Sequence, residues 1–275
     1  ACYNELLASW PVPFTRVRLS SRFGTTHVII CGPEDGPPLV LLHASGTSST
    51  VWSRNVGALS RTYRTYLVDI IGDPNLSDCT SPLKSRSDFV EWLSDCFNQL
   101  KIERADVAGI SFGGWTALNF AMGAPHRVKR LVLLSPAGLM PFRLMFFVYF
   151  LGPILFPSKR RAYSVLKWLA GSQGAVDERM AEQMFLAIKH FKIPLGGIWP
   201  SPFPDDDLRG LRVPTLLFIG EREVVVKPRR AFERATTLIP GIQAELVANA
   251  GHLLNREQAE SVNQRVLEFL AGAGK

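Results

Sequence analysis

The sequence predicts an α/β fold, with a mainly parallel eight-stranded sheet that is flanked by helices and interrupted by one helical insertion. Short apolar segments rich in β-branched residues alternate along the chain with helical patterns, as in β-α-β units. Most of these apolar segments are continuous, which is typical of strands covered on both faces of a parallel sheet. The alternation breaks once, because no strand is expected between residues 136 and 213.

The predicted strands follow one another from residue 14 to residue 247. A turn at Arg22–Gly24 joins the first two and predicts a leading antiparallel hairpin. Helices between the later strands predict crossover connections and parallel pairing. The eight predicted strands are Phe14–Leu19, His27–Cys31, Leu39–Leu42, Thr65–Val68, Ala105–Ala108, Leu131–Leu134, Thr215–Ile219 and Ala244–Val247.

Helical patterns separate these strands. In Asp88–Leu100, large apolar side chains recur at helical spacing, which predicts an amphipathic helix. Similar patterns predict helices over Trp115–Met122, Pro228–Leu238 and Glu257–Leu270. We therefore expect residues 1–135 and 213–275 to form one core. Residues 136–212 are expected to form a helical lid inserted between the sixth and seventh strands.

The insertion is rich in aromatic residues and methionine. Its most apolar part, Leu139–Phe156, approaches the length of a membrane span, but Pro141, Arg143, Gly152 and Pro153 interrupt it. A buried or cleft-lining helix is therefore expected there, and no stable membrane span.

Composition limits the classes of function. The chain has 275 residues, 47% of them hydrophobic, and a formal net charge of +7, which indicates a globular chain with a sizeable core. The basic residues are scattered and accompany no zinc-finger or RNA-binding motif, so nucleic acid is not an expected partner. Four cysteines without CxxC spacing favour reduced thiols and a cytoplasmic location, with a single disulfide left open. The first ten residues show no signal-peptide pattern.

One strand runs directly into a motif with catalytic character. After Ala105–Ala108 the chain continues G-I-S-F-G (109–113) and enters a predicted helix. A G-x-S-x-G motif between a strand and a helix is the context of a nucleophile elbow. Glycines leave room for the tight turn, and the helix N-terminus supplies oriented N–H groups for a developing oxyanion. Ser111 is therefore the predicted nucleophile.

A serine nucleophile requires a base, and the chain has five histidines. His252 follows the last predicted strand, so it should lie in a loop at the carboxyl edge of the sheet, where ligands bind in open α/β sheets. His27 lies within a strand and His126 in a basic loop, which favours structural or surface roles for both, and His190 lies in the insertion. His252 is the predicted base, and a capping histidine is the alternative.

The base in turn requires an orienting carboxylate. The strand Thr215–Ile219 is followed by Glu221 and Glu223. Glu223 comes after the turn and is better placed to point back across the sheet, whereas Glu221 is expected to face solvent or pair with an arginine. The order serine, acid, histidine is the order found in hydrolases with a nucleophile elbow.

Another loop is expected near the serine. The strand Leu39–Leu42 ends in H-A-S-G-T (43–47), whose short side chains allow a backbone N–H to approach a reacting carbonyl opposite Phe112. An ordinary Ser/Gly loop is the alternative. The acidic run Asp205–Asp207 could indicate a cation site, but its position before a helical turn favours N-capping and solvation. No metal or organic cofactor is predicted.

Five segments together resemble the α/β-hydrolase superfamily, and within it the small lidded bacterial carboxylesterases. The resemblance implies Ser111 as nucleophile, His252 as base and Glu223 as acid. It also implies that the backbone N–H groups of Phe112 and Ser45 form an oxyanion hole. The five segments are LLHASGTSSTVW, VDIIGDPNLSD, VAGISFGGWTALNFA, VPTLLFIGEREVVV and VANAGHLLNREQAESVNQRVLEFL.

The resemblance extends over residues 15–270 and includes two departures. The usual His-Gly after the third strand is here His43-Ala44, and the acid is Glu where Asp is more usual. Haloalkane dehalogenases carry Asp at the position of Ser111, so that class is disfavoured.

The resemblance implies a serine hydrolase that cleaves carboxylic esters through an acyl-enzyme. The apolar insertion predicts apolar or aromatic substrates, against the alternative that it only packs the lid onto the core. A small-molecule ester is the expected partner, and a homodimer stays open. Because a fold does not choose its chemistry, the alternatives are a C–C bond hydrolase, a perhydrolase or a ligand-binding receptor that retains the triad.

Overall fold

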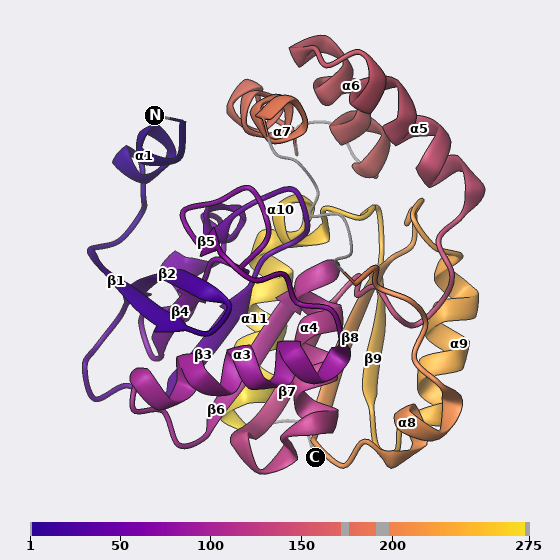
Figure 1. The fold of residues 1–275 in the computed structure, drawn as a ribbon. Helices are drawn as coiled ribbons and strands as arrows, with labels where there is room; N and C mark the ends of the chain where they lie inside the picture. The colour runs from indigo at the N-terminus through magenta and orange to yellow at the C-terminus, as the bar shows by residue number, and fades with distance from the viewer. Residues whose placement is uncertain (1, 172–175, 191–197, 273–275) are drawn as a thin grey trace.

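The computed structural model describes residues 2–171, 176–190 and 198–272, and a nine-stranded sheet forms its centre (Figure 1). The strands follow the order β1-β2-β4-β3-β6-β7-β8-β9, and β5 pairs with β2 beside this path. β2 is antiparallel to β1 and β4, whereas the pairs from β4 to β9 are parallel. The predicted α/β fold with a leading hairpin is confirmed.

All eight predicted strands are present, and each is longer than predicted. The prediction of eight strands is nevertheless wrong by one, because β5 pairs with Gly24 and Thr25 of β2. Two residues are too few to show a strand pattern, so only the pairing reveals β5. The strands are β1 (Phe14–Ser21), β2 (Gly24–Cys31), β3 (Pro38–Leu42), β4 (Arg64–Val68), β5 (Asp78–Cys79), β6 (Ala105–Ile110), β7 (Val128–Leu134), β8 (Thr215–Gly220) and β9 (Gln243–Val247).

Helices cover both faces of the sheet (Figure 1). In β3, Val40 and Leu42 join one hydrophobic cluster and Leu39 and Leu41 the other, because successive side chains of a strand point to opposite faces. α3, α4 and α9 contribute to the first cluster, and α2 and α11 to the second. The helices are α1 (Cys2–Ala8), η1 (Ser49–Trp52), α2 (Val56–Leu59), α3 (Arg86–Gln99), α4 (Phe112–Gly123), η2 (Pro125–Arg127), α5 (Leu144–Leu155), α6 (Lys159–Leu169), α7 (Glu178–His190), α8 (Asp205–Gly210), α9 (Pro228–Leu238), α10 (Leu254–Glu257) and α11 (Ala259–Ala271).

The predicted helices are confirmed, with some ends shifted. α3 begins at Arg86 because a capping box precedes it: the Ser85 hydroxyl accepts from the Asp88 N–H, and the Asp88 carboxylate accepts from the Ser85 N–H. The helix predicted over Glu257–Leu270 is α11, which begins two residues later and ends one residue later, whereas the short helix α10 before it was not predicted. The N-terminal helix α1 was not predicted.

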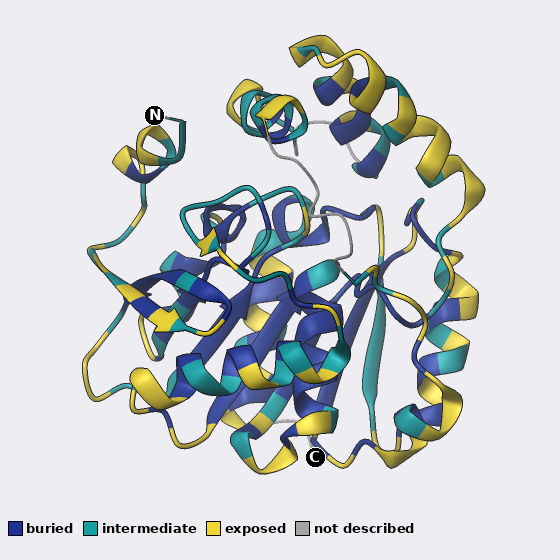
Figure 2. Ribbon diagram, in the orientation of Figure 1, coloured by how far each residue is buried: buried dark blue, intermediate teal, exposed yellow. Residues whose placement is uncertain are grey.

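The interpretation of Leu139–Phe156 as a buried or cleft-lining helix is wrong. α5 occupies this segment, but Pro153 is its one buried residue, and most of its large apolar side chains are exposed (Figure 2). The apolar composition predicted burial. However, α5 stands at the rim of the molecule and packs against α6 and α7, which leaves one side open (Figure 1). No helix in the described residues is long and apolar enough to cross a membrane.

The helices α5, α6 and α7, called the cover helices below, lie across one edge of the sheet (Figure 1). Two backbone hydrogen bonds of 2.8 Å connect this part of the chain to loops at the carboxyl ends of the strands. The Arg143 N–H donates to the Val225 carbonyl, and the His252 N–H donates to the Leu169 carbonyl. The cover helices therefore lie over the edge where a site is expected, whereas α8 packs beside α9.

Candidate active site

Ser111 lies in a sharp turn between β6 and α4. Its backbone angles are φ 52° and ψ −112°, a conformation that residues other than glycine rarely adopt and that stores strain. Close backbone packing surrounds the turn. A Cβ on Gly109 would lie 2.2 Å from the carbonyl oxygen of Gly113, and a Cβ on Gly113 would lie 2.3 Å from that of Leu42. The turn is therefore a tight strand–helix elbow that requires both glycines.

Hydrogen bonds of 3.0 Å hold the elbow in place. The Ser111 N–H donates to the Leu134 carbonyl of β7, and the Ser111 carbonyl accepts from the N–H groups of Trp115 and Ala137. Phe112 is the first residue of α4, so its N–H has no acceptor within the helix. This N–H and the positive end of the helix dipole are available to an anion next to Ser111.

Two further predicted residues meet at neighbouring strand ends. His252, in the loop after β9, donates from Nδ1 to Oε2 of Glu223, in the loop after β8, at 2.7 Å. The Glu223 Oε1 atom accepts from the Val225 N–H at 2.7 Å. The Glu223 side chain is fully buried and that of His252 is 10% exposed, whereas Glu221 is exposed. With Nδ1 bonded to Glu223, Nε2 of His252 is the nitrogen left to accept a proton.

Burial by itself raises the pKa of the Glu223 carboxyl group. Favourable contacts outweigh this effect, the largest being the charge that His252 can carry, followed by the hydrogen bond from His252 and the hydrogen bond from the Val225 N–H. The pKa of Glu223 consequently lies below its usual value. An ionised Glu223 can therefore orient His252 and stabilise an imidazolium on it.

Ser111 lies at the same sheet edge as the Glu223–His252 pair. β6, β7, β8 and β9 are consecutive and parallel, so the loops that follow them open on one side. The elbow and the Glu223 loop are two strand spacings apart, about 10 Å. Both Ser111 and His252 are described, and no hydrogen bond joins their side chains. In enzymes without substrate, catalytic hydrogen bonds are often long and tighten only when substrate binds.

The loop after β3 lies beside the elbow, because β3 pairs with β6. Asp73, in the loop after β4, holds the loop after β3 in place. Its Oδ1 atom accepts from the Ser45 hydroxyl and from the Gly46 N–H, both at 3.2 Å. Asp73 is buried, and burial raises its pKa. The sequence analysis did not single out Asp73. The available signal was its place in the loop after β4, but only the sheet order sets β4 next to β3.

His43 fixes the start of the same loop. Its Nε2 accepts from the Ile70 N–H at 2.8 Å, and a backbone N–H can only donate. The proton of the neutral ring is therefore on Nδ1, which donates to the Ala44 carbonyl at 2.8 Å. The same carbonyl accepts from the Thr47 hydroxyl at 2.6 Å. His43, which is fully buried, thus supports the loop that carries Ser45, a role that the sequence analysis missed.

The remaining histidines have other surroundings. His27 is buried on β2, with Nδ1 2.9 Å from Oδ2 of Asp69. His126 and His190 are exposed, the latter at the end of α7. The positions of His27 and His126 agree with the structural and surface roles predicted for them.

The acidic run Asp205–Asp207 forms the first turn of α8, but the predicted N-capping is wrong. The N-cap position is Pro204, which has no side-chain cap, and each carboxylate instead pairs with an arginine. Within the described residues, no group of three or more His, Cys, Asp or Glu side chains is placed to hold a metal ion. The ion pairs are Asp205–Arg234, Asp206–Arg209 and Asp207–Arg86.

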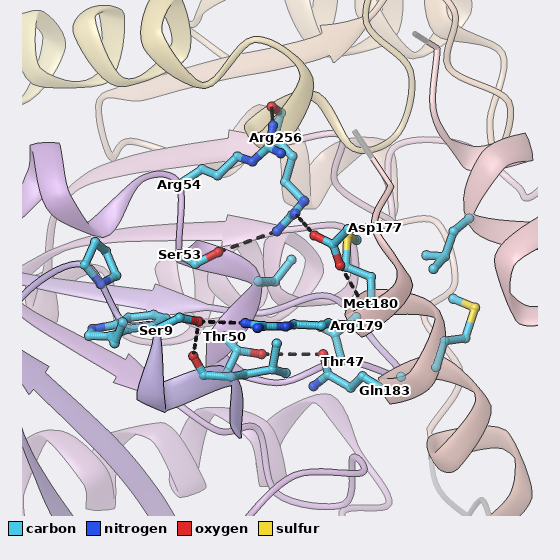
Figure 3. Close-up of a pocket in the computed structure, with 17 residues that line it drawn as sticks. Ser9, Thr47, Thr50, Ser53, Arg54, Asp177, Arg179, Met180, Gln183 and Arg256 are labelled. Carbon is cyan, nitrogen blue, oxygen red and sulfur yellow. Dashed lines mark hydrogen bonds and ion pairs between the residues drawn. The ribbon is translucent and has the colours of Figure 1, made fainter. Parts of the chain in front are cut away.

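A cavity of about 320 Å³ opens on the other side of the loop after β3 (Figure 3). None of the predicted catalytic residues lines it. The Arg256 guanidinium donates to Asp177 at 2.9 Å, and Arg179 donates to the Ser9 hydroxyl at 3.1 Å; both contacts are drawn in Figure 3. These contacts join the region of α7 to α10 and to the segment before β1. The cavity is therefore a seam between a cover helix and the core, distinct from the elbow.

The site combines a strained serine elbow at the carboxyl edge of a parallel sheet with a buried glutamate–histidine pair two strands away. This arrangement is that of a nucleophilic hydrolase on an α/β fold. A family model described as the alpha/beta hydrolase family matches residues 39–265. The chain belongs to this family, as the resemblance in the sequence predicted.

Three relatives place the chain more closely. Carboxylesterase YbfK of Bacillus subtilis (strain 168) is 41% identical over 99% of this chain and 93% of its own length. The crystal structure of naproxen esterase from Bacillus subtilis is 40% identical, with a TM-score of 0.92 and coverage of 98% of this chain and 95% of that one. A 2-hydroxy-6-oxo-2,4-heptadienoate hydrolase of Pseudomonas putida is 30% identical over 86% of this chain and 90% of its own.

Proposed function

We propose that this enzyme is a serine carboxylesterase that uses Ser111, Glu223 and His252 as its catalytic triad. The backbone N–H groups of Phe112 and Ser45 complete the site as its oxyanion hole. The observation that carries the proposal is the 2.7 Å hydrogen bond between buried Glu223 and His252, at the same sheet edge as the strained Ser111. The similarity to carboxylesterase YbfK supports carboxylic esters as the substrate class.

Acylation begins when Oγ of Ser111 attacks the ester carbonyl carbon and His252 Nε2 takes the hydroxyl proton. Negative charge develops on the carbonyl oxygen, and the N–H groups of Phe112 and Ser45 stabilise it. His252 then gives its proton to the ester oxygen. The bond from carbon to that oxygen breaks, the alcohol leaves, and the acyl group stays on Ser111.

Deacylation repeats these steps with water. His252 takes a proton from a water molecule, whose oxygen attacks the acyl carbon. The bond to Ser111 Oγ breaks as His252 returns the proton to it, and the carboxylic acid leaves. Glu223 keeps Nδ1 of His252 protonated throughout, so Nε2 is always the nitrogen that exchanges protons.

A fluorophosphonate probe tests the nucleophile directly. We expect one adduct, located on Ser111 by mass spectrometry, and loss of p-nitrophenyl butyrate hydrolysis in step with labelling. Ser111→Ala should prevent labelling and lower kcat by about 10⁴-fold or more. Ser135, which follows β7 and also has a positive φ of 40°, is the natural internal comparison. An adduct on Ser135, or none at all, would overturn the triad.

The ester substrates are proposed to carry a bulky apolar or aromatic group. Phe142 packs on Phe146 and on Trp199, with ring centroids 4.9 and 5.7 Å apart, at the entry to the cover helices. The similarity to naproxen esterase supports an aryl group in the substrate. Since each buried methylene contributes about 0.8 kcal/mol, kcat/KM should rise from p-nitrophenyl acetate to butyrate, octanoate and arylacetate. A flat series would mean that these rings only pack the cover helices onto the core.

C–C bond hydrolysis is the second candidate, because a 2-hydroxy-6-oxo-2,4-heptadienoate hydrolase is 30% identical to this chain. Ser111 would then attack a ketone carbon, and a carbon leaving group would take the proton. Comparing kcat/KM for p-nitrophenyl butyrate and for a 2-hydroxy-6-oxodienoate decides between them. A higher value for the dienoate would replace the esterase proposal.

The division into a core (1–135 and 213–275) and a lid (136–212) is also proposed, with the cover helices as the part of the lid above the site. All four cysteines carry free thiols, which supports a reducing compartment such as the cytoplasm. The proposed partner is the small-molecule ester and not a nucleic acid. Multi-angle light scattering tests whether a homodimer forms.

A further inference from the structure

α5 exposes an unusual amount of apolar surface. Leu144 is 77% exposed, Leu155 59% and Phe156 63%, and Trp199 extends the surface because its ring lies 6.3 Å from that of Phe147. Contiguous apolar surface on this scale marks an interaction site in soluble domains. We call it the apolar patch; it comprises Leu144, Met145, Phe147, Val148, Tyr149, Leu151, Ile154, Leu155, Phe156 and Trp199.

The chain around the apolar patch carries positive charge without negative charge. No Asp or Glu occurs between residues 107 and 176, and α5 itself has no charged residue. Arg143 precedes α5, and Lys159, Arg160 and Arg161 begin α6 directly after it. These four residues are called the basic cluster. One of them, Lys159, forms an ion pair with Glu182 of α7.

The basic cluster is physically continuous with the apolar patch. The Arg161 guanidinium lies 5.6 Å from the centroid of the Phe156 ring and donates to the Phe156 carbonyl at 2.8 Å. Arg160 is exposed at the same helix start. Exposed aromatic rings are also part of the surface, and aromatic side chains favour the boundary between lipid and water.

We propose that the apolar patch and the flanking basic residues form a docking surface for an anionic lipid bilayer. The apolar side chains of α5 enter the boundary between headgroups and acyl chains, while Arg143, Arg160 and Arg161 contact lipid phosphates. α5 then lies in the plane of the surface, as a peripheral contact and not a span. The cover helices, and the sheet edge below them, face the membrane in this orientation.

Charge decides between a bilayer and a second copy of this chain. A symmetric dimer presents the same surface from both copies, so pairing through α5 would bring the exposed arginines of both copies to one interface, where α5 has no charged residue to pair with them. Like charges at an interface oppose association. An anionic bilayer covers the same apolar side chains and neutralises the cluster.

Sedimentation of the full chain with vesicles tests the proposal. We expect binding to vesicles of phosphatidylglycerol mixed with phosphatidylcholine, weaker binding at high salt, and little binding to phosphatidylcholine alone. Leu151→Asp combined with Leu155→Asp should abolish binding, because both side chains belong to the apolar patch. Arg160→Glu should weaken it by at least about fivefold.

Matched variants separate the surface from general effects. Arg230→Glu makes the same charge change at an exposed position of α9 and should leave binding nearly unchanged, and Leu155→Met should also bind. Unchanged melting temperatures and unchanged hydrolysis of a water-soluble ester would show that the variants are folded. No binding to anionic vesicles, or equal loss with Arg230→Glu, would overturn the proposal. So would a dimer that Leu155→Asp dissociates, since α5 would then be an interface between copies.

Discussion

Gly171, two residues after the end of α6, packs backbone against backbone on Gly251, the residue before His252. A Cβ on Gly251 would lie 2.3 Å from the Gly171 nitrogen and 2.6 Å from the Leu169 oxygen. The Arg222 guanidinium reinforces the contact, because it donates to the Gly171 carbonyl at 2.7 Å. The loop that positions the proposed base is therefore held from above by a cover helix as well as from below by the sheet.

Gly251→Ala should impair catalysis without touching the triad. The added methyl group forces the Gly171 and Leu169 backbone away and breaks the hydrogen bond from the His252 N–H to the Leu169 carbonyl. We expect a loss of about 1–3 kcal/mol in stability and a fall in kcat larger than any change in KM. Thermal melting and p-nitrophenyl butyrate kinetics measure both effects. Gly210→Ala is the control, since nothing lies near its Cβ position.

Glu223→Gln should lower kcat by roughly 10³–10⁴-fold with the fold intact, because an amide no longer stabilises the imidazolium or the required tautomer of His252. Glu221→Gln, two residues away and exposed, should retain nearly full activity. Steady-state kinetics of the two variants give the ranking, and circular dichroism checks the fold. If Glu221→Gln were the inactive one, the proposed acid would be incorrect.

Asp73→Ala should reduce activity through the oxyanion loop. Asp73 holds the Ser45 hydroxyl and the Gly46 N–H, and loss of one oxyanion donor typically costs about 10²–10³ in rate. Because the donor would be loosened and not removed, we expect a fall in kcat of about tenfold to a hundredfold. Asp78→Ala, which removes an exposed carboxylate paired with Arg18, serves as the control for losing an acid. Equal kinetics in the two variants would argue against a role for Asp73 in positioning Ser45.

Asp106→Asn should stabilise the protein at alkaline pH. Asp106 is buried on β6, where burial raises its pKa to about 6, against the opposing charges of Lys129, Arg130 and Arg104. The folded pKa lies above the unfolded value of 3.8, so protonation stabilises the native state fully below pH 3.8, and this contribution is lost as the pH rises through about 6. At pH 8 the variant avoids a buried charge and should gain up to about 3 kcal/mol.

Denaturant unfolding of both proteins at pH 4 and pH 8 checks this expectation. The difference in unfolding free energy should be larger at pH 8, with Asp95→Asn on α3 as a less buried comparison. A difference that does not depend on pH would mean that Asp106 is not the titrating group.

The sequence by itself determined the elements that depend on local pattern. All eight predicted strands were found, and most of them carry continuous apolar runs, because burial on both faces leaves a signal in each strand separately. The elbow was found for a similar reason: Gly109, Ser111 and Gly113 lie within five consecutive residues, and the turn they form requires glycine on either side of the serine. Amphipathic helices such as α9 were predicted at their observed ends.

Tertiary structure decided what depends on neighbours distant in the chain. Asp73 supports Ser45 only because β4 lies beside β3, and Glu223 meets His252 only because β8 lies beside β9. The exposure of α5 was missed for the same physical reason. Apolar composition reports a preference for burial, but whether another element covers a helix is set by how the whole chain packs, and no element covers the outer side of α5 in the described residues.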